Sequence, residues 1–237
     1  MDVSSLGEAL VLVPHPDDES IGCGGLLRQL YEQTIPTTVV LVSDGSGGGT
    51  LPEGTDHKRE KEFRRAMALL HPDAKLVFWR LPDGQLENSP ELLPRLERLL
   101  AHCTAKTVVC PWREDLHPDH AAIAWGLEQS LAFTSVEQVL YYEIWTPLVA
   151  NRILEVSEHW STKKQALSCH VTALECGDYV RAMEGLATYR SLFTQSMARA
   201  GHYAEAYRSE AVQSQRYVQP LWHRLLCRLS RYGAKQN

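Results

Sequence analysis

Short apolar runs alternate with segments of helical periodicity along the first 145 residues of the chain. Residues 9–14 (ALVLVP) are apolar at every position, which is typical of a strand buried on both faces of a parallel sheet. Residues 20–33 then carry apolar side chains at the spacing of an amphipathic helix. The same alternation predicts further strands at 37–43, 75–79, 106–110 and 138–145, and helices at 56–70, 90–102 and 118–133. It favours an α/β fold with a Rossmann-like, mostly parallel sheet flanked by helices.

Beyond this region the pattern becomes mainly helical. Helices are predicted near residues 161–176, 179–200 and 219–232. No internal repeat, low-complexity tract or clear linker interrupts the chain. We therefore expect a single domain over residues 1–237, with its core at about 9–207 and a helical C-terminal addition.

The last predicted helix, residues 219–232, is basic and amphipathic. Leucines form one stripe and arginines lie opposite: Leu221, Leu225, Leu226 and Leu229, against Arg224, Arg228 and Arg231. This pattern favours a terminal helix that packs on its own domain or on another subunit of a homo-oligomer. Peripheral contact with an anionic membrane is the competing hypothesis.

Composition and charge narrow the class of protein. With 24 basic and 29 acidic side chains the 237-residue chain has a formal charge of −5, which argues against a partner nucleic acid. No apolar run is long enough for an integral membrane segment, and the first residues lack the basic region of a signal peptide, so we expect a cytoplasmic location. The 6 cysteines form no CxxC pair, which disfavours a disulfide scaffold or a thiolate zinc site.

Two short segments share a His-Pro-Asp turn after a predicted strand. One is HPDDE at residues 15–19, and the other is HPDH at residues 117–120. Residues three apart share one face of a helix's first turn, and ligands of open α/β sheets bind beyond the carboxyl ends of strands. Two histidines, a carboxylate and an open water position make a catalytic zinc site, which His15, Asp18 and His120 can supply. Either segment alone is more readily explained as an ordinary surface or capping turn, but the two together favour a metal.

These motifs resemble those of the LmbE/PIG-L family of zinc-dependent N-acetylglucosaminyl deacetylases. The resemblance rests on HPDDE followed by SIGCGGLL, and on HPDH. Softer similarities are LVSDGSGG, the R-x-x-E pattern from Arg59, LPDGQL, YYEIWTP, KQAL and YAEAY, so the match spans about residues 9–207. The sequence departs from the family at His170, where a Ser-Gln pair is common.

The resemblance implies a role for each matching residue. His15, Asp18 and His120 would hold Zn²⁺, with Fe²⁺ as the alternative ion. Asp17 would act as general base toward the attacking water. His117 would stabilise the oxyanion or protonate the leaving amine.

It also implies supporting and substrate-binding residues. Asp119 would orient His117, so an Asp119→Ala variant is expected to keep the metal and turn over more slowly. Arg59 would contact the sugar. From their positions at strand ends, Asp44 and Trp112 are further candidates for substrate binding. Three tryptophans are expected near the rim of the site, as core packing or as a sugar platform: Trp79, Trp112 and Trp145.

The predicted function is removal of the N-acetyl group from an N-acetylglucosamine-type sugar or sugar conjugate, a small-molecule substrate. A first alternative is hydrolysis of another sugar-linked amide, such as a thiol conjugate, at the same metal site. A second is a Rossmann-like module that binds a nucleotide-sugar without turnover. The glycines of residues 22–25 favour close helix packing over a dinucleotide site, because HPDDE occupies the turn where a pyrophosphate would bind.

Overall fold

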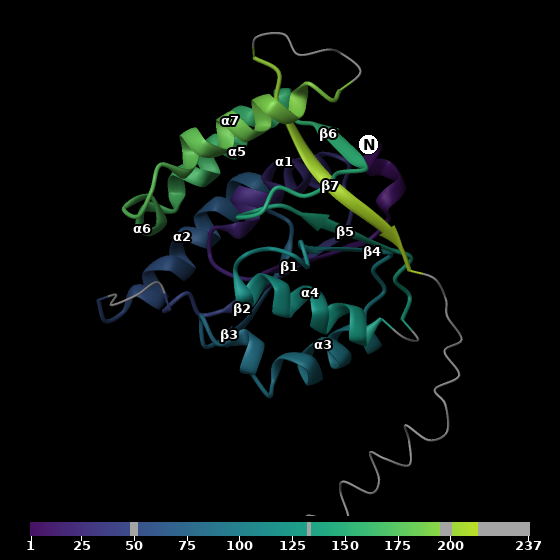
Figure 1. Cartoon of the computed structure of the whole chain (residues 1–237), viewed down its shortest axis with the longest axis vertical. Coiled ribbons are helices and arrows are strands. Elements are labelled where there is room, and N and C mark those ends of the chain that lie inside the picture. Colours follow the sequence, from purple (N-terminus) through teal and green to yellow (C-terminus); the bar gives the residue numbers. More distant parts are fainter. Residues whose placement is uncertain (48–51, 132–133, 195–200, 213–237) are drawn as a thin grey trace, which may run out of the picture.

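The computed structural model describes residues 1–47, 52–131, 134–194 and 201–212. These residues form one seven-stranded sheet in the order β3-β2-β1-β4-β5-β7-β6 (Figure 1). The strands are β1 (Ala9–Val13), β2 (Thr37–Ser43), β3 (Lys75–Leu81), β4 (Thr107–Pro111), β5 (Gln138–Tyr142), β6 (Arg152–Glu155) and β7 (Ala204–Ala211).

The first five strands run parallel to one another, and β7 pairs antiparallel with both β5 and β6. The predicted α/β fold and its five parallel strands are confirmed. The prediction that the region after residue 145 is helical was incomplete, since it also supplies β6 and β7. β6 has only four residues, and β7 (AEAYRSEA) consists mostly of alanine and charged residues, which have low β-propensity.

Helices cover both faces of the sheet (Figure 1). On one face lie α1 (Asp18–Glu32), α2 (Thr55–Leu70) and α5 (Trp160–Cys169), and on the other lie α3 (Leu92–Ala101) and α4 (Pro118–Ser130). The remaining helical elements are η1 (Val3–Leu6), η2 (Leu86–Asn88), η3 (Ser157–His159), α6 (Val171–Leu174) and α7 (Tyr179–Ser191). Alternate residues of β1 enter opposite cores, Val11 with α1 and Leu10 with α4, as the two-residue period of a strand requires.

The strand order places a topological switch point between β1 and β4. The chain leaves β1 toward one face of the sheet, where α1 packs, and leaves β4 toward the other, where α4 packs. Two neighbouring strands whose helices diverge leave a crevice at their carboxyl ends, and this is where open α/β sheets bind ligands. HPDDE and HPDH both lie at this crevice.

The helix that begins at that crevice, α1, has a kink. Cys23 has non-helical dihedral angles (φ −142°, ψ 24°), so the helix restarts after it. The Glu205 carboxylate accepts the freed N–H groups of Gly25 (2.6 Å) and Leu26 (2.9 Å), and Lys163 Nζ lies 2.7 Å from it. A carboxylate from β7 thus caps the second half of α1, a place where negative charge is favoured.

Two glycines let α1 approach its neighbours closely. A Cβ atom at Gly22 would lie 2.2 Å from the Tyr142 ring, and one at Gly25 would lie 2.4 Å from Val156. Both distances are shorter than real Cβ contacts. The structure therefore agrees with a packing role for residues 22–25.

Several predictions concern residues that the structure does not describe. The basic helix expected at 219–232 lies outside the described residues, so its contact with a membrane, the domain or another subunit stays a prediction, as does a single domain over the whole chain. Among the described helices, none combines the length and apolarity needed to span a bilayer. The cytoplasmic location remains a prediction from the sequence.

Candidate metal centre and active-site pocket

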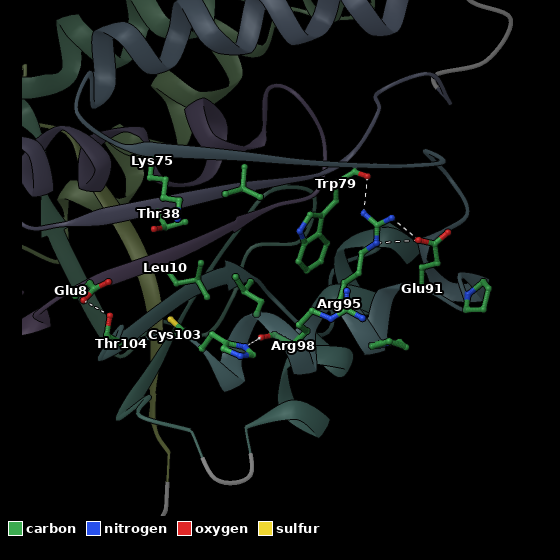
Figure 2. Close-up of a pocket in the computed structure, with 15 residues that line it drawn as sticks. Glu8, Leu10, Thr38, Lys75, Trp79, Glu91, Arg95, Arg98, Cys103 and Thr104 are labelled. Atoms are coloured by element: carbon green, nitrogen blue, oxygen red, sulfur yellow. Dashed lines mark hydrogen bonds and ion pairs between the residues drawn. The ribbon is translucent and has the colours of Figure 1, made fainter.

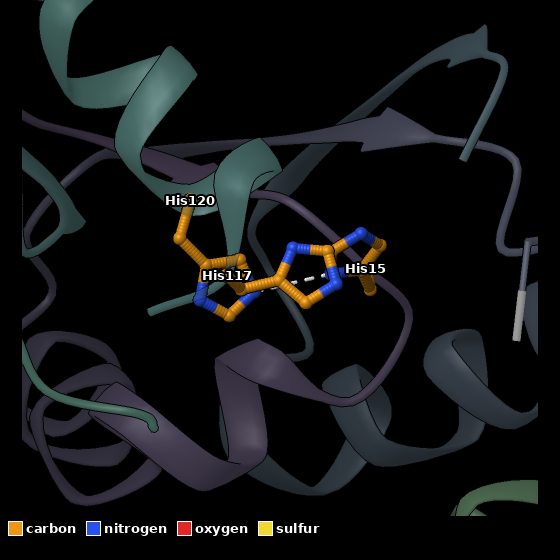
Figure 3. A group of neighbouring side chains, drawn as sticks. All are labelled: His15, His117 and His120. Atoms are coloured by element: carbon orange, nitrogen blue, oxygen red, sulfur yellow. Dashed lines mark hydrogen bonds between the residues drawn. The ribbon is translucent and has the colours of Figure 1, made fainter. Parts of the chain in front are cut away.

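Two turns at neighbouring strand ends bring the HPDDE and HPDH residues together. His15 follows β1, and Asp18 is the first residue of α1. After β4, α4 begins at Pro118, where the missing N–H costs no helical hydrogen bond, and His120 lies in the first turn. Figure 3 shows the imidazoles of His117 and His120, at the start of α4, facing that of His15.

Three potential ligand atoms form a nearly equilateral triangle. Nδ1 of His15 lies 3.1 Å from Oδ2 of Asp18 and 3.2 Å from Nε2 of His120, and the Asp18 to His120 distance is 3.3 Å. Ligand atoms about 2.0–2.1 Å from a tetrahedral zinc ion lie about 3.3–3.4 Å from one another. The spacing and the donor set of two nitrogens and one oxygen therefore fit a zinc ion without rearrangement.

The far ring nitrogens of both histidines face carboxylates. Nε2 of His15 lies 3.0 Å from Asp83 and 3.2 Å from Asp119, and Nδ1 of His120 lies 3.1 Å from Asp115. A histidine that ligates a metal usually donates its other N–H to such a partner, which fixes the tautomer and raises the basicity of the ring. This arrangement is the expected support for a metal centre.

Two other groups also bring ligand atoms within 4.8 Å of one another. They are His15 with His117 and His120, and His15 with Asp83 and Asp119. In the first, Nδ1 of His117 already accepts the backbone N–H of Asp119. In the second, the carboxylates accept backbone N–H groups or face an arginine. The set of His15, Asp18 and His120 combines two imidazoles and one carboxylate at 3.1–3.3 Å, and its Asp18 Oδ2 likewise accepts one backbone N–H, that of His15 at 2.9 Å.

The electrostatics of the cluster favour positive charge. Burial would raise the pKa of Asp18, but the charge and hydrogen bonds of His120 and His15 hold it well below its usual range. Burial would lower the pKa of His120, but Asp18 and Asp115 outweigh it and raise this pKa to about 9. The same field that stabilises imidazolium here would stabilise a divalent cation.

The three consecutive acids have separate partners. Asp17 lies 3.4 Å from Nη2 of Arg59, and Glu19 lies 2.7 Å from Nε2 of the buried His170. Only Asp18 faces the two histidines. His170, where the sequence departs from the LmbE/PIG-L pattern, therefore neutralises one acid of the HPDDE motif.

A pocket of about 280 Å³ opens beside this cluster. Asp17, His117 and Arg59 line it, and Arg59 Nη1 donates to the Gly45 carbonyl at 2.8 Å. Asp44, by contrast, accepts hydrogen bonds from the backbone N–H groups of Ser46 and Asp83. Among the described residues, it does not line the pocket. Its role in substrate binding stays a prediction.

Among the three tryptophans, Trp145 lines the pocket. Trp112 instead packs edge-on against Tyr141, with ring centroids 5.4 Å apart. Trp79 lies in a larger hollow of about 780 Å³ between α3 and strands β1–β3 (Figure 2). There Arg95 is held by Glu91 and the Trp79 carbonyl, and none of the predicted catalytic or metal-ligating residues is present. The smaller pocket is therefore the candidate active site.

His117 has a defined tautomer, and Asp119 has an unexpected partner. Because Nδ1 of His117 accepts the Asp119 backbone N–H at 3.2 Å, the neutral ring carries its proton on Nε2. Burial and the nearby charges of His15 and His120 lower the pKa of His117, which favours that neutral form. The Asp119 carboxylate, expected to orient His117, instead contacts His15.

Sequence reasoning missed Asp115. Its carboxylate faces Nδ1 of His120 and accepts the backbone N–H groups of His117 (2.9 Å), Trp145 (3.0 Å) and Thr146 (3.1 Å). The available signal was chemical, since a ligating histidine needs a carboxylate on its second nitrogen and Asp115 is a nearby acid.

The chain is similar to deacetylases of known sequence. It is 27% identical over 183 residues to a probable N-acetyl-α-D-glucosaminyl L-malate deacetylase 2 of Bacillus anthracis, a match that covers 69% of this chain and 80% of that protein. It is 24% identical over 187 residues to the diacetylchitobiose deacetylase of Thermococcus kodakarensis, covering 69% of this chain and 68% of the relative.

Solved structures share the fold. A conserved protein of Thermus thermophilus superposes with a TM-score of 0.75 at 23% identity, over 90% of this chain and 99% of that one. A 4-carboxy-2-hydroxymuconate hydratase of Pseudomonas putida has a TM-score of 0.73 at 20% identity, over 86% and 95% of the two chains. Since a hydratase has this fold too, the fold alone does not determine the reaction.

The family assignment rests on sequence. Residues 10–130, just over half of the chain, match the family model described as PIG-L, GlcNAc-PI de-N-acetylase. This segment contains both the HPDDE and the HPDH turns, whose resemblance to the family is thereby confirmed. The chain belongs to the PIG-L (LmbE-like) de-N-acetylase family.

Proposed function

We propose that this protein is a metal-dependent hydrolase that removes the acetyl group from an N-acetylglucosamine-type sugar conjugate, releasing acetate and a free amine. The observation that carries the proposal is the triangle of ligand atoms from His15, Asp18 and His120 beside a pocket that also contains Asp17 and His117. The family match and the deacetylase relatives support it.

The ion would be held by Nδ1 of His15, Oδ2 of Asp18 and Nε2 of His120. This donor set suits Zn²⁺, and Fe²⁺ accepts the same ligands. When bound, such an ion polarises a carbonyl oxygen and lowers the pKa of water to about 7. An acetamide is a poor electrophile, so the reaction needs this activation.

Asp17 is the proposed general base. Its carboxylate lines the pocket next to the ligand Asp18, and burial together with the charge of Asp18 raises its pKa. A carboxylate with a raised pKa is a better proton acceptor at neutral pH. Arg59, 3.4 Å away, holds its orientation and keeps part of its negative charge compensated.

His117 is the proposed donor to the developing oxyanion. The backbone N–H on Nδ1 leaves Nε2–H as the proton that the neutral ring can donate. The ring is half-buried, lines the pocket and stacks on His120 with centroids 4.6 Å apart. Loss of one oxyanion donor typically costs about 10²–10³ in rate.

A binding module without turnover would not require a carboxylate and an imidazole next to the ligand set, so these two groups favour the hydrolase. The test is metal analysis combined with acetate release from N-acetylglucosamine conjugates. We expect about one zinc per chain, loss of activity on chelation and recovery with Zn²⁺. A zinc-loaded, folded protein that releases no acetate from any of these conjugates would contradict the proposal.

A further inference from the structure

The active-site pocket has an aromatic wall that the proposed reaction does not use. Trp145 and Tyr179 line it, with ring centroids 6.0 Å apart and planes at 77°. The Trp145 residue is 52% exposed. A large ring left open to solvent inside a pocket offers contact area to a ligand.

The backbone at Trp145 is tied to the predicted metal ligands through Asp115. One oxygen of Asp115 accepts the backbone N–H groups of Trp145 and Thr146, while the other faces Nδ1 of His120. Leu116, in the neighbouring loop between β4 and α4, donates its N–H to the Thr146 hydroxyl and further ties the two loops together. The backbone that carries Trp145 is therefore preorganised, which lowers the cost of binding.

The charge of the pocket restricts what can lie against this wall. Among the described residues that line it, Arg59 is the only arginine or lysine, and it already contacts Asp17, Asp83 and the Gly45 carbonyl. No further arginine or lysine of the described lining is available for a carboxylate or phosphate on the substrate. Such a group would meet the charges of Asp17 and Asp83 instead, and like charges disfavour binding.

We infer that the group attached to the amino sugar is uncharged and rests a flat apolar face on Trp145 and Tyr179. This inference rests on the proposed deacetylase function and names the class of conjugate. The C–H face of a second sugar or an aromatic ring has this chemistry. Malate, named in the substrate of the Bacillus anthracis relative, is anionic at neutral pH and does not.

Three β-glycosides of N-acetylglucosamine, differing only in the attached group, test the inference with the zinc-loaded full chain. They are the methyl, phenyl and carboxymethyl glycosides, and acetate release gives kcat and KM for each. We expect kcat/KM to be roughly tenfold higher for phenyl than for methyl, and lowest for carboxymethyl. Trp145→Ala should abolish the preference for the phenyl over the methyl glycoside by raising KM for the phenyl glycoside, and Trp145→Phe should retain most of this preference.

Trp125→Ala is the matched control, because Trp125 is also 52% exposed but lies on α4 outside the pocket lining. It should leave all three substrates unchanged. Equal losses on all three glycosides in Trp145→Ala, or a preference for the carboxymethyl glycoside, would overturn the inference. If the wild type hydrolyses none of the three glycosides, the proposed function fails. The role of the aromatic wall is then decided by calorimetry, because Trp145→Ala must weaken binding of the phenyl glycoside roughly tenfold.

Discussion

Replacing Asp119 by alanine tests whether this carboxylate acts through His15 or through His117. Its Oδ2 lies 3.2 Å from Nε2 of His15, whereas only its backbone N–H contacts His117. A carboxylate on the second nitrogen of a ligating histidine fixes the ring and raises its basicity. We therefore expect Asp119→Ala to weaken metal binding, in contrast to the expectation from sequence that the metal stays and only turnover slows.

The size of the effect follows from what Asp119 contacts. Loss of such a partner typically costs about 10–100-fold in metal affinity. Asp83 lies 3.0 Å from the same nitrogen and can replace part of the contact, so about tenfold is expected for Asp119→Ala and about 100-fold with Asp83→Asn added. Asp119 also accepts the N–H groups of Gly84 (2.7 Å) and Leu86 (2.9 Å). Leaving two such donors unpaired should lower the free energy of unfolding by about 2–6 kcal/mol.

The assay is titration of the metal-free protein with zinc against a chromogenic chelator. Urea unfolding of the same metal-free samples separates lost affinity from lost fold. Asp44→Ala is the control, because Asp44 also accepts backbone N–H groups beside a strand end, including that of Asp83, without contacting His15. Wild-type zinc affinity in both the single and the double variant, with kcat reduced, would show that Asp119 acts through His117 and would refute the reasoning.

Three further predictions address the base and the packing around the site. Asp17→Asn should keep its zinc and lose about 10²–10⁴-fold in acetate release, because an amide oxygen cannot take the proton; near-normal turnover of a zinc-loaded sample would exclude this role. Arg190→Leu should lower the free energy of unfolding by about 3–5 kcal/mol, since it leaves Glu143 buried without its partner; urea unfolding measures this, and adding Glu143→Gln should recover part of it. Gly25→Ala should lower the free energy of unfolding by about 1–3 kcal/mol, because the new Cβ would lie 2.4 Å from the Val156 side chain. Gly185→Ala has open space around it and should raise the free energy of unfolding by about 0.4–1 kcal/mol. Thermal unfolding measures both, and the opposite order would contradict the packing argument.

The strands that sequence predicted are those with an apolar signal on both faces. β1 and β2 are buried between two helical layers and consist almost wholly of apolar or β-branched residues. Their own residues therefore predict a strand without any knowledge of tertiary contacts. β7 is different, because Glu205 within it serves as a helix cap and partner of Lys163. Tertiary partners stabilise this strand against its own weak propensity, and no local pattern shows them.

The candidate site divides in the same way. His15 with Asp18, and His117 with His120, are each three residues apart in one turn, so their proximity is encoded locally. Asp115 is also close in sequence but points to His120 only because the loop at Trp145 supplies N–H groups to its other oxygen. The tryptophan that lines the pocket likewise depends on loop geometry, which the sequence pattern does not contain.

The three acids of HPDDE show how one short motif can join the site to the fold. Adjacent carboxylates repel one another, and one shared cation could neutralise all three. The structure instead separates them: Asp17 faces Arg59 on α2, and Glu19 faces His170 between α5 and α6. Only Asp18 is left for the proposed ion, at a helix N-terminus where negative charge is already favoured. Protein partners thus face the first and third acids of the motif while the middle one faces the histidines, and this links the geometry of the metal centre to the packing of α2 and α5 on α1.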